Sequence, residues 1–124
     1  MEQAVATTEK PRTRGKAAAV GAPLDRDRVA RELARLHDET RGAEAFRKAA
    51  VDLFLEALTD GHARAKILLE SSGRGLACAR FLSELEDELI RAIYDCVTRY
   101  IYPAQNPSSA ERMAVCAVGG YGRG

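Results

Sequence analysis

Aromatic residues and net charge are both scarce in this sequence. It has no tryptophan, four tyrosines and three phenylalanines among 124 residues, so it offers little surface on which bases could stack. Its 19 basic and 18 acidic residues give a formal net charge of +1. Because so small a charge creates no field that attracts polyanions, we expect neither nucleic acid nor a membrane surface as a partner.

Cysteines and long apolar runs are also few. Cys78, Cys96 and Cys116 form no C-x-x-C pair, and free cysteines usually behave as small buried hydrophobes. We therefore expect three buried, reduced thiols, no metal site and a reducing cytoplasmic location. The apolar run Ala17–Ala22 is too short for a secretion signal or a membrane span.

The segment 1–23 is rich in small and polar residues. It cannot bury enough apolar surface to offset the entropy cost of ordering, which predicts a disordered tail. Its basic residues suit a solvated tail better than an arm that docks on an anionic partner; they are Lys10, Arg12, Arg14 and Lys16.

A first helix is predicted to begin after Asp25, whose side chain suits an N-cap. Val29, Leu33 and Leu36 follow at helical spacing on one face. The helix is expected to end near Thr40–Gly42, where glycine provides a stop.

A second helix is predicted from Ala43. Its apolar stripe consists of Phe46, Ala50, Leu53, Phe54 and Ala57, and resumes with Ala65, Leu68 and Leu69. Gly61 lies between these parts and either breaks the helix or is tolerated within it. The composition of 71–75 predicts a turn.

The third helix has the most regular pattern. Its apolar stripe is formed by Leu82, Leu85, Leu89, Ile93, Cys96 and Tyr100. Pro103 predicts an end by Tyr102. The acidic run Glu86–Glu88 is expected on a solvated face rather than at a metal. Together the three stripes predict a mainly α helical hairpin or bundle over residues 24–104.

The remaining residues, 105–124, do not continue the helical pattern. Ser108 and Glu111 have capping-box spacing, which suits a short helical turn. Met113–Val118 is an uninterrupted apolar run, which favours a buried strand. Because no second strand is predicted, we expect the rest of its sheet to lie beyond residue 124.

A glycine cluster follows this run, with Gly119, Gly120, Gly122 and Gly124 around Tyr121 and Arg123. Glycine lets the backbone approach a ligand closely, and successive N–H groups can hold phosphate oxygens. Arg123 would add a planar cation. The spacing matches neither a P-loop nor the dinucleotide fingerprint, and a plain flexible turn is the alternative.

The run Ala117–Gly124 resembles the opening of the nucleotidyltransferase domain in bacterial PII uridylyltransferases, members of the DNA polymerase β-like superfamily. The segment Leu82–Ala92, followed by Asn106–Pro107 and Glu111–Arg112, is similar to their N-terminal helical region. The resemblance covers residues 24–124. It implies that 105–124 begin a truncated α+β nucleotidyltransferase domain, entered through the strand described above.

The resemblance also implies a function. Such enzymes transfer UMP from UTP to a tyrosine of the PII nitrogen-regulatory protein and hydrolyse it off again, using Mg²⁺ held by an Asp-x-Asp pair. Gly119, Gly120 and Arg123 become the nucleotide-binding candidates, Gly122 serves the turn, and Tyr121 either packs or binds. No Asp-x-Asp follows the loop. We therefore expect the chain to stop inside the loop, to contain no catalytic or metal-binding residue and to be inactive alone.

The family's hydrolase and glutamine-sensing domains have no counterpart in this sequence. His37 and His62 are not followed by the aspartate of an HD motif and are expected at surface or helix-terminal positions. Two other interpretations stay open. One is a non-enzymatic helical interaction module with a glycine-rich tail, and the other is a nucleotidyltransferase with a different acceptor.

Overall fold

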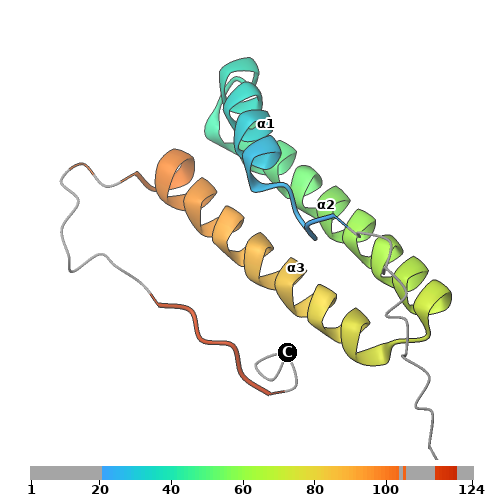
Figure 1. Cartoon of the computed structure of the whole chain (residues 1–124). Helices are drawn as coiled ribbons and strands as arrows, with labels where there is room; N and C mark the ends of the chain where they lie inside the picture. Colours follow the sequence, from blue (N-terminus) through green and yellow to red (C-terminus); the bar gives the residue numbers. More distant parts are fainter. Residues whose placement is uncertain (1–20, 104, 106–113, 120–124) are drawn as a thin grey trace, which may run out of the picture.

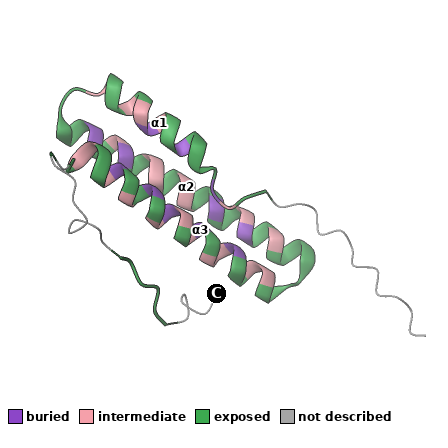
Figure 2. Cartoon of the chain, turned by 60° about the vertical axis from the view of Figure 1, so that its left-hand side comes forward, coloured by how far each residue is buried: buried purple, intermediate pink, exposed green. Residues whose placement is uncertain are grey.

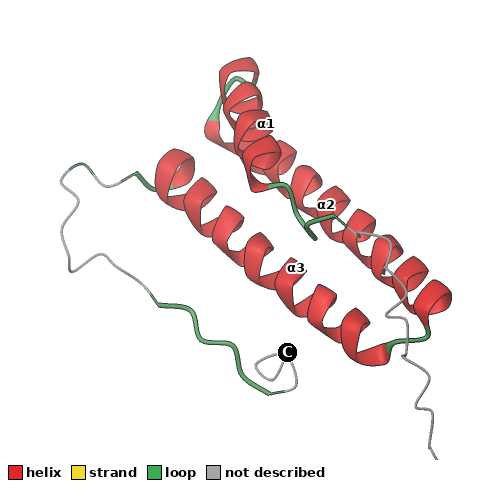
Figure 3. Cartoon of the chain, viewed as in Figure 1, coloured by secondary structure: helices red, strands yellow, loops and turns green. Residues whose placement is uncertain are grey.

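Three α-helices make up most of the computed structural model, which describes residues 21–103, 105 and 114–119 (Figures 1 and 3). They are α1 (Arg26–Glu39), α2 (Ala43–Ser72) and α3 (Gly75–Cys96), and a short π-helix, η1 (Val97–Ile101), extends α3. The described ranges contain no strand. The predicted mainly α fold of the helical region is therefore confirmed.

Helix α1 begins and ends as the sequence predicts. The carboxylate of Asp25 accepts a hydrogen bond of 2.9 Å from the backbone N–H of Arg28, which satisfies one of the free donors of the first turn. Val29 and Leu33 are buried on the inward face. The chain leaves the helix through Gly42, whose φ of +96° is a conformation that glycine adopts without strain.

Helix α2 is continuous, so Gly61 is tolerated and does not break it. Phe46, Ala50 and Ala65 are buried, as predicted. Leu69 was expected on the same stripe, but it is 42% exposed. It lies near the end of α2, where the apolar stripe has turned away from the neighbouring helix.

The connection between α2 and α3 is shorter than the predicted turn. Ser71 and Ser72 remain helical, and both hydroxyls donate to the carbonyl of Leu68. Gly73, with a φ of +63°, ends α2 in a left-handed cap, and α3 starts only two residues later at Gly75. The predicted turn over 71–75 is therefore wrong at both of its ends.

Helix α3 also begins earlier than its predicted stripe, and its buried face is rotated. The buried residues are Phe81, Leu85, Leu89, Ala92 and Cys96. Leu82 is half-buried and packs against the core, as predicted, whereas Ile93 is 39% exposed and was assigned wrongly to the buried face. The reason is that α1 and α2 both pack on α3, which turns its buried face toward Ala92. The helical segment ends before Tyr102, as predicted.

Helices α2 and α3 form an antiparallel hairpin, and α1 lies against the half of it that contains the start of α2 and the end of α3 (Figures 1 and 2). Their contact faces share one apolar core, in which Leu85 is completely buried. Where the three elements meet, the ring of His37 lies 5.3 Å from that of Phe46 and 4.7 Å from that of Tyr100. These aromatic contacts join the end of α1 to the start of α2 and to η1.

The apolar run after the helices does not form the predicted buried strand. Its described part, 114–118, has no strand conformation and is exposed. Strand pairing needs a neighbouring strand, and the described ranges provide none. Cys116 in this run is therefore exposed, against expectation, whereas Cys96 is buried and Cys78 is half-buried. The predicted tail up to residue 20 and the turn at Ser108 lie outside the described residues.

Candidate functional site

The predicted nucleotide site is described only at its first residue. Gly119 forms a turn with a φ of +73°, and a Cβ built on it would meet no atom within 4 Å. A glycine in this conformation suits the role predicted for it, because other residues adopt positive φ only with strain. Gly120 and Arg123 lie outside the described residues. The phosphate cradle that these three residues are expected to form stays a prediction.

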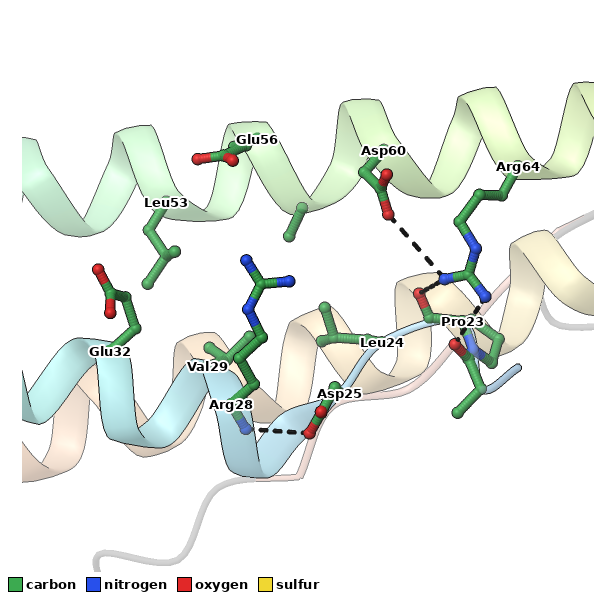
Figure 4. Close-up of a pocket in the computed structure, with 12 residues that line it drawn as sticks. Pro23, Leu24, Asp25, Arg28, Val29, Glu32, Leu53, Glu56, Asp60 and Arg64 are labelled. Atoms are coloured by element: carbon green, nitrogen blue, oxygen red, sulfur yellow. Dashed lines mark hydrogen bonds and ion pairs between the residues drawn. The ribbon is translucent and has the colours of Figure 1, made fainter. Parts of the chain in front are cut away.

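Within the described ranges, the clearest concave feature is a groove between the start of α1 and the middle of α2 (Figure 4). Its volume is about 480 Å³. The apolar floor is formed by Leu24, Val29, Leu53 and Ala57, and the charged rim by Asp25, Arg28, Glu32, Glu56, Asp60 and Arg64. The rim carries both signs of charge, so the groove suits polar ligands but does not select anions.

Arg64 closes one end of this groove and holds the chain that leads into α1. Its guanidinium donates to the carbonyl oxygens of Gly21, Ala22 and Pro23 at 3.0, 3.1 and 3.3 Å. Figure 4 shows the Arg64 side chain reaching the backbone at Pro23. The same guanidinium lies 5.3 Å from the centre of the Phe81 ring, within the range of a cation–π contact. One side chain on α2 therefore connects the segment before α1 with α3.

Arg64 was not among the residues predicted for a site. A signal for it is present, because Arg64 falls three residues after Gly61 and seven after Ala57, on the edge of the apolar stripe of α2. A cation at such a position must find a partner or reach solvent. The carbonyls that it binds lie more than forty positions away in sequence, and the pattern of α2 alone cannot indicate them.

The acids of the rim are occupied mostly by local pairs. Asp25 caps α1, and Asp60 lies 4.0 Å from Arg64. Hydrogen bonds from the Arg35 guanidinium hold the pKa of Glu32 below its usual value. These carboxylates therefore have partners close by and stabilise helix ends and helix surfaces.

The described ranges contain no cluster of side chains suited to binding a metal ion. In them, no three His, Cys, Asp or Glu residues lie close enough together to hold a metal ion. Glu88, from the acidic run, pairs with Arg26 at 3.4 Å and with Arg91 at 2.7 Å. Burial raises the pKa of the Cys96 thiol, which keeps it protonated and unreactive.

The two histidines are placed as the sequence predicts. His37 lies in the last turn of α1, half of its side chain exposed, and His62 is exposed on α2. The described helices also include none that is long and apolar enough to cross a membrane. The structure thus defines a small helical module whose clearest polar feature is the groove between α1 and α2.

Comparison with known proteins identifies what this module is similar to. No family model and no solved structure matches the chain. Curated proteins do match, and two of them are named bifunctional uridylyltransferase/uridylyl-removing enzyme. The one from Phenylobacterium zucineum is 45% identical over 80 residues, and the one from Bradyrhizobium diazoefficiens is 41% identical over 102 residues.

These relatives are much longer than the chain. The first match covers 64% of this chain but 8% of the relative, and the second covers 82% of this chain but 11% of the relative. A continuous match of 102 residues in a chain of 124 must include the stretch from 23 to 102. The similarity therefore extends over all three helices and is not confined to the glycine cluster.

Proposed function

We propose that the chain is the N-terminal helical region of a bifunctional uridylyltransferase/uridylyl-removing enzyme, followed by the beginning of its nucleotidyltransferase domain. The observation that carries this proposal is the 41% identity over 82% of the chain to a protein of that name. The glycine cluster after the helices is where the resemblance places the nucleotide. Gly119, with its positive φ, supports that placement.

The proposed reaction transfers UMP from UTP to a tyrosine hydroxyl of the PII signalling protein. The tyrosine oxygen attacks the α-phosphate, and pyrophosphate leaves. In the proposed site, backbone N–H groups of Gly119 and Gly120 approach the phosphates, and Arg123 pairs with a phosphate oxygen. The same enzyme would hydrolyse UMP from PII in a separate domain.

The cofactor of this reaction does not fit the residues described here. Mg²⁺ neutralises the triphosphate and stabilises the leaving pyrophosphate, and it requires carboxylate ligands. Residues 21–103, 105 and 114–119 contain no cluster of three His, Cys, Asp or Glu residues that could hold a metal ion. We propose that the metal ligands belong to an Asp-x-Asp pair downstream of Gly124, and that the helical region shapes the protein around the site.

The first experiment reads the gene downstream of codon 124 and assays the 124-residue chain. An Asp-x-Asp on the next predicted strand supports the proposal. The isolated chain is expected to give no Mg²⁺-dependent labelling of PII by UTP, whereas the full-length enzyme labels it. Labelling by the pure chain, or a gene without paired aspartates, would refute the assignment.

A second experiment tests Arg123 in the full-length enzyme. Loss of a charged hydrogen bond to phosphate costs roughly 1.5–3 kcal/mol. Arg123→Ala should therefore lower kcat/KM for UTP by about tenfold to a hundredfold. Arg74→Ala is the matched control, because Arg74 is exposed between α2 and α3 and far in sequence from the loop. Equal kinetics for both variants would remove Arg123 from the site.

A further inference from the structure

One side of the α2–α3 hairpin exposes a group of large apolar residues. Val51 and Leu55 on α2 are 49% and 55% exposed, and Ile93 on α3 is 39% exposed. Half-buried apolar residues continue the group. We call the whole set the open face: Val51, Leu55, Leu58, Ile90, Ile93 and Val97.

The register of the hairpin brings these residues together. A Cβ on Gly61 would touch Leu85, and the Cys78 thiol lies 3.5 Å from the carbonyl oxygen of Ala65. Because the two helices are antiparallel, these two contacts set Val51 and Leu55 level with the stretch 88–95 of α3. The open face is therefore one continuous surface that spans both helices.

Helix α1 does not cover this surface. Arg26 of α1 forms ion pairs with Glu88 at 3.4 Å and with Asp95 at 3.1 Å, so these acids mark the side of α3 that faces α1. Helical periodicity places Ile90 and Ile93 on the other side. On α2, Leu53 faces the groove beside α1 (Figure 4), and periodicity turns Val51 and Leu55 away from it.

Several large apolar side chains gathered on one surface indicate an interaction site. A candidate occupant lies in the same polypeptide. The apolar run after the helices exposes Val115 by 58% and Val118 by 78%, so it too has apolar surface without a partner in the described ranges. Eleven residues, 102–112, separate it from η1, a span of at most roughly 40 Å. Such a tether raises the effective concentration of one surface near the other to the millimolar range.

The length of the relatives points to the same occupant. The aligned residues make up only 8% and 11% of those proteins, so in them this helical region is joined to much more chain. We propose that the open face is the surface on which the domain that begins with Met113–Val118 docks, within one polypeptide. The docking rests on the proposed function for the longer polypeptide, but not for the identity of that domain as a nucleotidyltransferase.

Cysteine labelling tests this contact. Leu55→Cys is compared in the 124-residue chain and in the full-length protein, and the modified peptide 49–64 is followed by mass spectrometry, so other cysteines do not interfere. In the short chain residue 55 is exposed and should react quickly. In the full-length protein its reaction with maleimide should be at least about tenfold slower, because the docked domain must open first. Glu56→Cys is the matched control, since Glu56 lines the groove on the other side of α2 and should react equally in both proteins.

Light scattering on the same samples separates the possible partners. Slow labelling of residue 55 in a monomeric full-length protein supports docking within one chain. Equal labelling rates in both proteins would overturn it. Slow labelling that appears only in concentration-dependent dimers would overturn it in favour of a second copy. Uridylyl transfer is assayed separately. If residue 55 is protected from labelling but the full-length protein transfers no UMP, the proposed function is rejected and the docking proposal stands.

Discussion

Gly61 shows how a single residue controls the packing of the hairpin. A Cβ added there would lie 2.3 and 2.7 Å from the two methyl carbons of Leu85 and 3.1 Å from its Cγ. Leu85 is completely buried, so its methyl groups have little space into which to move. The sequence alone left the role of Gly61 open, because helix propensity reveals the cost of glycine but not the close approach of α3. Glycine is required here by the contact between the helices.

We predict that Gly61→Ala destabilises the chain. Alanine gains about 1 kcal/mol of helix propensity, but an extra carbon in a filled core costs about 1–3 kcal/mol. The net loss is therefore expected near 1 kcal/mol in urea unfolding followed by circular dichroism. Gly75→Ala is the control, because no atom lies within 4 Å of its added Cβ, and it should be neutral or slightly stabilising. Equal stabilisation by both changes would show that α3 yields without cost.

The burial of another single residue, Cys96, makes the stability of the chain depend on pH. Burial raises the pKa of its thiol, so the unfolded chain loses this proton at a lower pH than the folded chain. The stabilisation is fully present below the unfolded value, about 8.5, and is lost as the pH rises through the folded pKa. We predict falling stability in this alkaline range.

Two comparisons check the assignment to Cys96. Cys96→Ala should lower stability at neutral pH by creating a small cavity, and it should flatten the decline on the alkaline side. Exposed Cys116 should react with a thiol reagent well before Cys96 does. An unchanged alkaline decline in Cys96→Ala would assign the effect to another group.

At the level of elements, the helices were predicted better than their ends and faces. Capping by Asp25 and the stop at Pro103 are local signals, and both are confirmed. The short turn at Gly73 was missed, because the hydroxyls of Ser71 and Ser72 bond back to Leu68 and keep α2 helical. The rotation of α3 could not be predicted, since periodicity identifies an apolar stripe but not which of two neighbouring helices will bury each edge of it.

Arg64 is the side chain through which α2 controls the entry into α1. We predict that Arg64→Ala lowers the free energy of unfolding by about 1–2 kcal/mol, since it removes charged hydrogen bonds to three carbonyls at a partly exposed position. Amide exchange should accelerate most at 24–29, where the chain enters α1. This local effect distinguishes Arg64 from a residue that merely adds to the core.

Arg91→Ala is the matched control for that prediction. Arg91 pairs with Glu88 on the surface, and such pairs contribute little. It should change stability by less than about 0.5 kcal/mol and leave the exchange of 24–29 unaltered. Equal effects of the two variants, or uniform acceleration throughout the chain in Arg64→Ala, would contradict the assigned role.

At the level of the whole molecule, the residues that predicted the function are not the residues that predicted the fold. The helical region followed from periodicity, whereas the family was suggested mainly by eight residues around the glycines. The matched relatives add identity across the helices. The site itself was less accessible to sequence reasoning. A phosphate cradle depends on backbone conformation at several successive residues, and the groove is formed by residues that are distant in sequence, such as Pro23 and Arg64.

The division between fold and site leads to a prediction about the minimal folded unit. All core residues of the described ranges lie between Leu24 and Ile101, and 114–119 are exposed. A chain reduced to residues 21–103 keeps that core and the carbonyls bound by Arg64. Its Tm should therefore lie within about 4 °C of that of the 124-residue chain. A chain reduced to 25–103 loses Leu24 and those carbonyls. Its Tm should be lower by a further 4–8 °C, which corresponds to a loss of roughly 1 kcal/mol in the free energy of unfolding. Because the two shortened chains differ only at 21–24, their difference in Tm measures the connection between Arg64 and the start of α1. A large loss already in 21–103 would show that the removed segments contribute to the folded core.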